Sequence, residues 1–224
     1  MKKTLIALMA LAGIANANEY SGTFSWAANT NPVFTLSDEV VEEALTLTNI
    51  TCNKTYKATN VNSGTLTPNQ NVGEAAGNSW TLTFNVNNTT SQDIVLTGIT
   101  LDAFLFNGGG NSQNADTYAR PVSFTLTNGT DTVATTTVAY APTAAYQNDW
   151  ENDAVFSFGE GVTLAANSTA TYTLTVSNAQ TATAYGTFVG LKGATFTTAA
   201  IPEPTTATLS LLALAGLAAR RRRK

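Results

Sequence analysis

The densest group of residues that could do chemistry lies between Tyr146 and Asp153, in the sequence YQNDWEND. Asp149, Glu151 and Asp153 alternate with other residues, so in an extended chain their carboxylates fall on one face. Such a set could hold a hard cation such as Ca²⁺, although the segment lacks the glycine and the terminal glutamate of an EF-hand loop. The favoured interpretation is a solvated acidic loop whose Trp150 packs on the edge of the domain. A Ca²⁺ site is the alternative, and no other cofactor is expected.

Three aromatic side chains, Tyr118, Tyr146 and Trp150, lie in polar loops rich in Asn and Gln. An aromatic ring can pack on the apolar C–H face of a sugar while nearby polar groups fix its orientation. These residues are therefore candidates for a carbohydrate-binding site. The structural alternative for the loop from Asn107 to Tyr118 is a flexible hairpin tip. Its glycines are not followed by the Lys-Ser/Thr of a phosphate-binding loop.

The composition excludes several classes of enzyme. The chain has no histidine and a single cysteine, Cys52, which rules out Ser-His-Asp and Cys-His catalysis, an intramolecular disulfide and His-rich zinc sites. We expect Cys52 to be a small buried apolar residue. A glycosidase or lyase would need paired carboxylates facing a shared cleft, and the only dense acidic set lies on one short segment. We therefore expect a protein that is not an enzyme.

The segment 201–224 has three parts. Pro202, Glu203 and Pro204 are extended rather than helical, because proline fixes φ and restricts the residue before it. The apolar run from Thr205 to Ala219 would form about 22 Å of helix, which is short for a bilayer core of about 30 Å but could insert with local thinning. The positive-inside rule keeps the cations that follow in the cytoplasm; they are Arg220, Arg221, Arg222, Arg223 and Lys224. A buried or amphipathic helix with a solvated basic end is the alternative.

This layout resembles the PEP-CTERM sorting tail of Gram-negative bacteria, which membrane proteases of the exosortase type process; Ile201 stands where valine is commoner. The resemblance implies export through the inner membrane, with transient membrane contact through the C-terminal helix. It also implies a final place at the cell surface, in the outer envelope or in the extracellular matrix, with exopolysaccharide as the natural setting. Whether the tail is removed or kept as an anchor stays open.

The N-terminal residues agree with export. Two lysines precede an apolar run from Thr4 to Ile14, and Ala15-Asn-Ala17 has the small-x-small form of a signal-peptidase site. We place cleavage after Ala17, with a signal anchor as the alternative. The predicted organisation is a signal peptide at 1–17, a body at 18–200 and a sorting segment at 201–224. The body has four Lys or Arg against fourteen Asp or Glu, a net charge of −10, which disfavours nucleic acid as a partner.

Within the body, short segments alternate apolar and polar residues with the period of a half-buried strand. The clearest is Trp80–Val86. The runs Val122–Leu126 and Val133–Val138 flank Asn128-Gly129 and predict a hairpin. Ser37–Leu45 could be a helical turn or part of a strand, and Asn62–Ser79 and Ala141–Asp153 are predicted loops. The other predicted strands are Tyr20–Trp26, Val33–Leu36, Leu45–Thr51, Tyr56–Val61, Ile94–Phe106, Val155–Phe158, Thr171–Val176, Tyr185–Val189 and Ala194–Thr197.

About ten short strands without intervening helices predict an all-β protein with two packed antiparallel sheets. A jelly roll is the first choice and an immunoglobulin-like sandwich the second; the Asn-x-Thr turns resemble jelly-roll modules that accompany such tails. Trp26 and Trp80 are expected in the core. The predicted inward-facing residues are Leu82, Phe84, Val86, Phe104, Phe124, Leu126, Val155, Tyr172, Leu174, Val176 and Phe188. The leading functional hypothesis is a non-enzymatic matrix protein, followed by a carbohydrate-binding module and then a glycosidase or lyase.

Overall fold

The computed structural model describes residues 18–37, 44–73, 77–111, 120–140, 151–179 and 186–199, without the side chains of Ala139, Glu151 and Asn152. The predicted signal peptide and the sorting segment lie outside these ranges, as does 38–43 of the segment that could be helical. Residues Glu19–Ala199 form one unit of the chain. In the described ranges no helix is long and apolar enough to cross a membrane.

The secondary structure of the described residues consists of ten strands. They are β1 (Glu19–Ser25), β2 (Val33–Leu36), β3 (Leu45–Cys52), β4 (Ser79–Asn88), β5 (Ile94–Phe106), β6 (Arg120–Asn128), β7 (Asp131–Tyr140), β8 (Glu151–Leu164), β9 (Thr169–Asn178) and β10 (Phe188–Thr198).

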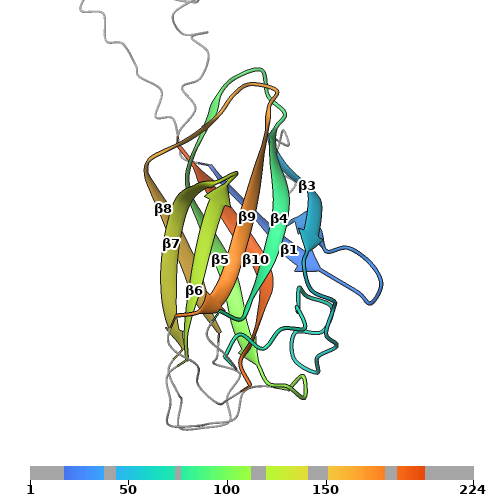
Figure 1. Ribbon diagram of the computed structural model, residues 1–224. Coiled ribbons are helices and arrows are strands. Elements are labelled where there is room, and N and C mark those ends of the chain that lie inside the picture. Colours follow the sequence, from blue (N-terminus) through green and yellow to red (C-terminus); the bar gives the residue numbers. More distant parts are fainter. Residues whose placement is uncertain are drawn as a thin grey trace, which may run out of the picture. The chain divides into compact units, whose positions relative to one another are not determined.

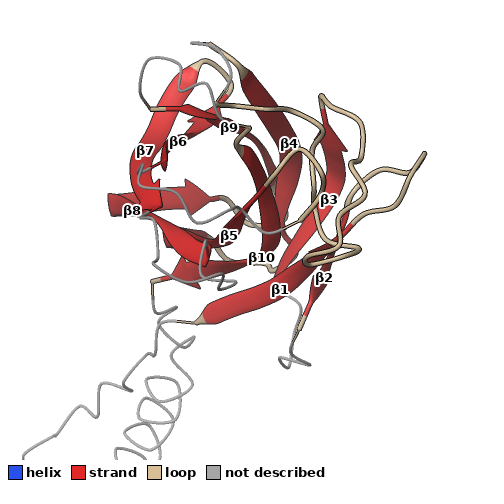
Figure 2. Ribbon diagram, turned by 90° about the horizontal axis from the view of Figure 1, so that it is seen from below, coloured by secondary structure: helices blue, strands red, loops and turns tan. Residues whose placement is uncertain are grey.

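The strands form two five-stranded sheets that face each other (Figures 1 and 2). Sheet A has the order β2-β1-β10-β5-β8 and sheet B the order β3-β4-β9-β6-β7, and every pair is antiparallel. The edge strands β7 and β8 lie side by side along one flank of the sandwich. The predicted antiparallel two-sheet architecture is therefore confirmed.

Eight of the ten strands pair as nested partners: β6 with β7, β5 with β8, β4 with β9, and β1 with β10. This is the pairing of one long hairpin whose tip is the β6–β7 turn. The pairs β5–β10 and β6–β9 then join its folded parts into the two sheets. At the tip, Asn128 pairs with Asp131, and Gly129 has a φ of 60°, a conformation that glycine adopts without strain.

Alternating side chains fill the space between the sheets. Phe24, Leu101 and Phe156 of sheet A meet Phe84, Leu126 and Leu174 of sheet B. Burying each such side chain contributes about 1.5–3 kcal/mol to folding. Trp26 and Trp80 are buried as expected, and so is every predicted inward-facing residue except Val155.

Val155 is 56 % exposed, so its assignment to the core is wrong. Its neighbours Ala154 and Phe156 are buried instead, and Phe156 pairs with Ile99 of β5. The segment Val-Phe-Ser-Phe carries apolar residues at both parities. The pairing with β5 decides which of them face inward.

Phe104 and Phe188 are buried, but in a second cluster with Phe106 and Val61 rather than between the sheets. Phe104 has the parity of Asp102, so it belongs to the outer face of sheet A. The long β3–β4 loop covers this part of the face, and its Leu66 is hydrogen-bonded to Leu191 of β10 through both backbone groups.

Four segments differ from the sequence-based assignment. Tyr56–Val61 is not a strand and contributes only an isolated bridge between Tyr56 and Pro68. Tyr185–Val189 and Ala194–Thr197 were separate predictions, but one strand, β10, covers Phe188–Thr198 because a bulge at Lys192 lets it continue. The predicted loop at Ala141–Asp153 is too long by three residues, which begin β8.

Candidate functional site

Most sequence-predicted ligand residues lie outside the described ranges. These are Tyr118, Tyr146, Trp150 and Asp149. The sorting residues Pro202, Glu203 and Pro204, the basic cluster and the cleavage residues Ala15 and Ala17 also lie outside them. Their predicted roles remain predictions.

Glu151 and Asp153 belong to strand β8, not to a loop. Asp153 is exposed and lies opposite Asp102 of β5. No group of three or more His, Cys, Asp or Glu is placed to hold a metal ion within the described residues. The Ca²⁺ hypothesis, which also needs Asp149, stays a prediction.

The outer face of sheet A carries a polar depression of about 290 Å³. One row of it runs across four strands, in the order Thr23, Gly193, Asp102 and Asp153. Hydroxyl groups line the neighbouring row, where the oxygen atoms of Ser21 and Thr195 are 2.9 Å apart. The carboxylates of Asp102 and Asp153 can accept hydrogen bonds and the ammonium group of Lys192 can donate them, so the depression offers both kinds of group.

The bulge in β10 explains how Lys192 reaches this depression. Pairing with β5 shifts by one residue between Leu191 and Gly193, so Lys192 is the additional residue. A Cβ atom on Gly193 would lie 2.4 Å from the carbonyl oxygen of Gly22. Glycine at 193 therefore lets β1 approach the bulged strand closely.

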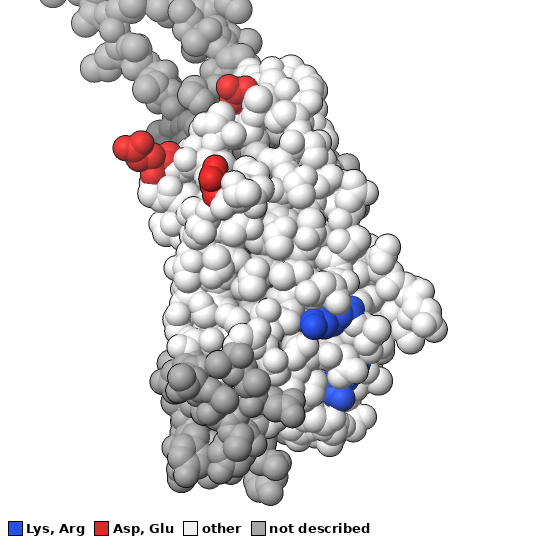
Figure 3. All heavy atoms as spheres, viewed as in Figure 1, with Lys and Arg blue, Asp and Glu red and all other residues white. Residues whose placement is uncertain are grey.

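The outer face of sheet B has a different character, because its outward side chains are almost all Thr, Ser or Asn, with Pro121 of β6 as an exception. We call this surface the hydroxyl face. It consists of Thr46, Thr48 and Thr51 of β3; Ser79, Thr81, Thr83, Asn85 and Asn87 of β4; Ser123, Thr125 and Thr127 of β6; Thr132, Thr135 and Thr137 of β7; and Thr169, Thr171, Thr173, Thr175 and Ser177 of β9. None of these residues is buried. Figure 3 views this side of the sandwich and shows no charged atoms across its middle.

The strand registers align the hydroxyl face into rows. One row joins all five strands through Thr51, Thr83, Thr173, Thr127 and Thr132. The next row joins Thr81, Thr175, Thr125 and Thr135 across four strands. Neighbouring strands lie about 4.8 Å apart, and successive outward residues on one strand about 6.8 Å apart. The face is therefore a grid of hydroxyl and amide groups, with register shifts in its outer strands between Thr48 and Thr51 of β3 and before Thr127 in the β6–β7 pair.

Hydrogen bonds between strands fix several of these side chains. The hydroxyl oxygen atoms of Thr83 and Thr173 are 3.2 Å apart. Thr171 and Thr169 donate hydrogen bonds to the side-chain oxygens of Asn85 and Asn87, at 2.9 Å and 2.8 Å. These contacts restrict the rotamers of the side chains that make them.

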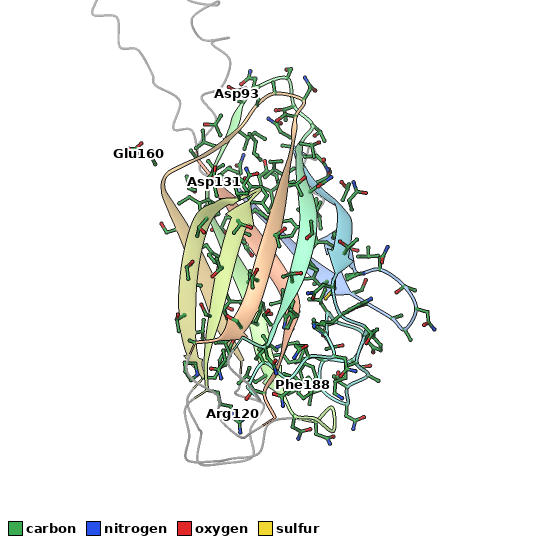
Figure 4. All side chains as sticks on the ribbon, in the orientation of Figure 1. Asp93, Arg120, Asp131, Glu160 and Phe188 are labelled. Atoms are coloured by element: carbon green, nitrogen blue, oxygen red, sulfur yellow. The ribbon has the colours of Figure 1, made fainter. Side chains whose placement is uncertain are left out.

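Several charged residues lie at the ends of the sandwich. Asp93, Asp131 and Glu160 lie at one end, and Arg120 lies at the other with Phe188 (Figure 4). Arg120 is buried, and its Nη1 donates a 2.8 Å hydrogen bond to the hydroxyl oxygen of Thr187. Lys57 also belongs to the Arg120 end, because its ammonium nitrogen lies 4.9 Å from the centre of the Phe188 ring.

Three further side chains with polar or reactive atoms lie on the core side of sheet B. Cys52 is a free, half-buried cysteine that faces Leu82 in the ladder, and burial raises the pKa of its thiol. A raised pKa disfavours the reactive thiolate. The side-chain nitrogen of Trp80 and the hydroxyl of Tyr172 are buried without hydrogen-bond partners. Trp80 belongs to β4 and Tyr172 to β9, and both side chains lie on the core side of sheet B.

Sequence reasoning missed both surfaces, although one signal was present. The residues that intervene between the apolar positions of Trp80–Val86 and Thr171–Val176 are Thr and Asn, without a single charge. A soluble surface usually mixes Lys, Arg, Asp and Glu among its polar residues. That departure marked the hydroxyl face, but only the strand order showed that five strands contribute to it.

Comparison with known proteins concerns the tail. Residues 200–224 match the family model described as the PEP-CTERM protein-sorting motif. A search among curated proteins finds no match to the chain. The match confirms the predicted sorting motif and supports an exosortase substrate. It implies export across the membrane and processing at the envelope by an exosortase-type protease.

Proposed function

We propose that this chain is an exported, non-enzymatic protein of the cell surface or extracellular matrix. It is sorted and processed through its PEP-CTERM tail, and its body associates with exopolysaccharide. The observation that carries the proposal is the match of residues 200–224 to the sorting motif. The exopolysaccharide partner follows from the resemblance to such exported proteins.

The chemistry of the tail supports stepwise processing. A signal peptidase would first cleave after Ala17, which frees the exported body. The apolar run Thr205–Ala219 would then hold the chain in the inner membrane, with the basic cluster on the cytoplasmic side. Pro202 and Pro204 would keep the segment before this run extended, which suits the active site of a protease.

The strand order supports a jelly roll as the topology of the body. A jelly roll is a double sheet of eight strands built from Greek keys, and the nested pairing of eight strands here fits that description. In an immunoglobulin-like sandwich the first two strands are neighbours of one sheet and are followed there by the fifth and fourth. Here β5 lies between β8 and β10 instead.

A non-enzymatic role is supported by the side chains available. The chain has no histidine for acid–base or nucleophilic catalysis. Asp153 is exposed to solvent, whereas the acid of a glycosidase works from an apolar enclosure. A polysaccharide-active glycosidase or lyase is therefore the least favoured of the three functions.

The second candidate function is a carbohydrate-binding module that uses Tyr118, Tyr146 and Trp150. The observation that favours it is the position of the strands that flank their loops. Arg120 at the start of β6 pairs with Tyr140 at the end of β7. The loop before Arg120 and the loop after Tyr140 are thus attached at the same end of the sandwich.

Fractionation of cells tests the leading proposal. Glu203→Ala, or replacement of Arg220–Arg223 by serine, should leave export intact and abolish processing of the tail. Glu160→Ala is the matched control in the body and should be processed normally. Normal processing and placement of both tail variants would show that the sorting assignment is wrong.

A further inference from the structure

We propose that the hydroxyl face of sheet B is the surface on which the body binds neutral polysaccharide chains. This inference rests on the proposed function, because it names the surface and the chemical class behind the association with exopolysaccharide. It differs from the second candidate function, which places binding in loops at one end of the sandwich.

The functional groups of the hydroxyl face match those of a neutral sugar. Each Thr or Ser hydroxyl offers one donor and two acceptor sites, and each Asn amide offers both kinds of group. Sugar hydroxyls have the same dual character, so either partner can donate. The methyl groups of threonine add small apolar contacts for the C–H faces of sugar rings.

The rows of the hydroxyl face suit a polymer better than a single small molecule. The row from Thr51 to Thr132 spans all five strands, and its members repeat at the strand spacing of about 4.8 Å. Each hydrogen bond contributes little in water. A polysaccharide that lies along several rows forms many of them after the first contact, at a high effective concentration.

Preorganisation lowers the cost of such contacts. The side chains of Thr169 and Thr171 are held by hydrogen bonds to Asn87 and Asn85, and Thr83 lies within hydrogen-bond distance of Thr173. A hydroxyl that donates to a neighbour keeps its acceptor sites for a ligand. Less side-chain freedom is then lost on binding.

The charge distribution selects a neutral polymer. The residues 18–200 carry a net charge of −10, which repels anionic polysaccharides at long range. The hydroxyl face itself contains no cation that could attract them and no carboxylate that could attract a cationic partner. Three of the described acids, Asp93, Asp131 and Glu160, lie at one end of the sandwich instead (Figures 3 and 4).

The same observations disfavour a second copy of the chain on this face. Two bodies of charge −10 repel each other. Stable protein interfaces are also built around Trp, Tyr, Arg or large apolar anchors, and none of these belongs to the hydroxyl face. The polysaccharide is therefore the favoured occupant.

The test uses the full chain purified in detergent and a panel of soluble neutral glucans and mannans, with a polyuronate as the anionic probe. The triple variant Thr125→Val, Thr173→Val, Thr175→Val removes three central hydroxyls. It keeps the side-chain shape and the strand propensity. Its affinity for the best neutral polysaccharide should fall by about tenfold or more. The matched control is Thr163→Val, an exposed threonine of β8 in sheet A, which should bind like the parent.

Binding should also be insensitive to salt, because no ion pair contributes to it. Thr175→Lys provides a second variant, whose long charged side chain should obstruct the face without removing the neighbouring hydroxyls. Melting curves establish that each variant is folded. Normal affinity of both sheet B variants, stronger binding to the polyuronate, or no binding to any neutral polysaccharide overturns the inference.

Two other results would show that the hydroxyl face binds something other than polysaccharide, and each would overturn the inference. In the first, the parent associates with itself and the triple variant does not. In the second, the parent arrests the growth of ice crystals. Loss of polysaccharide binding in Trp150→Ala alone would move binding to the loops and leave the proposed function standing. Processing of the tail is measured independently, so failure of the sorting assignment is distinguishable from failure of this inference.

Discussion

Asp102 of β5 and Asp153 of β8 lie directly opposite each other, with both side chains on the outer face of sheet A. Like charges in this arrangement destabilise a sheet by roughly 0.2–1 kcal/mol. Lys192 lines the same depression. Removing one of these two charges is therefore expected to change the stability of the body.

Asp153→Asn should increase the free energy of unfolding by about 0.2–1 kcal/mol at low salt, because it removes one of two facing charges. The gain should shrink at high salt, where exposed charges are screened. Denaturant unfolding measures both values. Glu160→Gln, an exposed acid outside this pair, is the control and should change stability much less. A loss of stability in Asp153→Asn at low salt would contradict the repulsion.

Millimolar Ca²⁺ should raise the melting temperature of the chain if Asp149, Glu151 and Asp153 bind it, because a ligand of the folded state stabilises that state. The double variant Asp149→Asn, Asp153→Asn should lose the rise, while Mg²⁺ serves as the control ion for the parent. An unchanged melting temperature of the parent in Ca²⁺ would retire the metal hypothesis.

Alkaline pH should destabilise the fold through Tyr140. Burial raises the pKa of its phenol, and the negative charges of Asp153 and Asp102 raise it further. An unfolded chain ionises its tyrosines from about pH 10, whereas Tyr140 in the folded chain stays protonated. The stabilising contribution is thus complete below about pH 10 and is lost as the pH rises above it.

Tyr140→Phe removes this ionisation and should make the free energy of unfolding fall less steeply between about pH 9 and 11. The slope is the measurement, since the variant can also lose contacts that lower its stability at every pH. Tyr172, whose phenol pKa is also raised by burial, gives a second variant with the same expected direction. An unchanged slope in Tyr140→Phe would show that this group does not set the alkaline limit.

Trp150→Ala separates packing from binding in the loop before β8. Loss of a packed Trp side chain should cost about 3–5 kcal/mol of stability. The second candidate function predicts little loss of stability and loss of most of the affinity for the extracellular polysaccharide of its own source. Binding by the hydroxyl face predicts unchanged affinity instead. A large fall in melting temperature would assign Trp150 to the core and leave the loop site without its anchor.

The two-sheet fold could be predicted because residues near each other in the sequence determine the alternation. Trp80, Leu82, Phe84 and Val86 are buried in that order along β4, as their spacing requires. Where apolar residues occupy both parities, as around Val155, alternation cannot choose the inward face. That choice depends on the partner strand β5.

The candidate surfaces depend on registers between distant segments, which no local pattern contains. Asp102 and Asp153 meet because β5 pairs with β8. Thr51 and Thr132 belong to one row because the three strands between β3 and β7 pair in a matching register. Likewise, Gly190 and Gly193 interrupt the apolar pattern of β10 and made one strand look like two. The structure shows that Gly193 meets the backbone of β1.

The nested pairing has a consequence for the passage of the chain across a membrane. β1 is the first strand of the body to emerge and β10, its partner, is the last; Ser21 and Thr195, whose oxygen atoms are 2.9 Å apart, are separated by 174 positions. β10 also lies between β1 and β5, so without it the β1–β2 pair is not joined to the rest of sheet A. Pairing of such distant segments is slow. If the chain crosses unfolded with its N-terminus first, the body completes its fold only after nearly all of it has crossed, and the finished sandwich then cannot return through a channel that passes only unfolded chains.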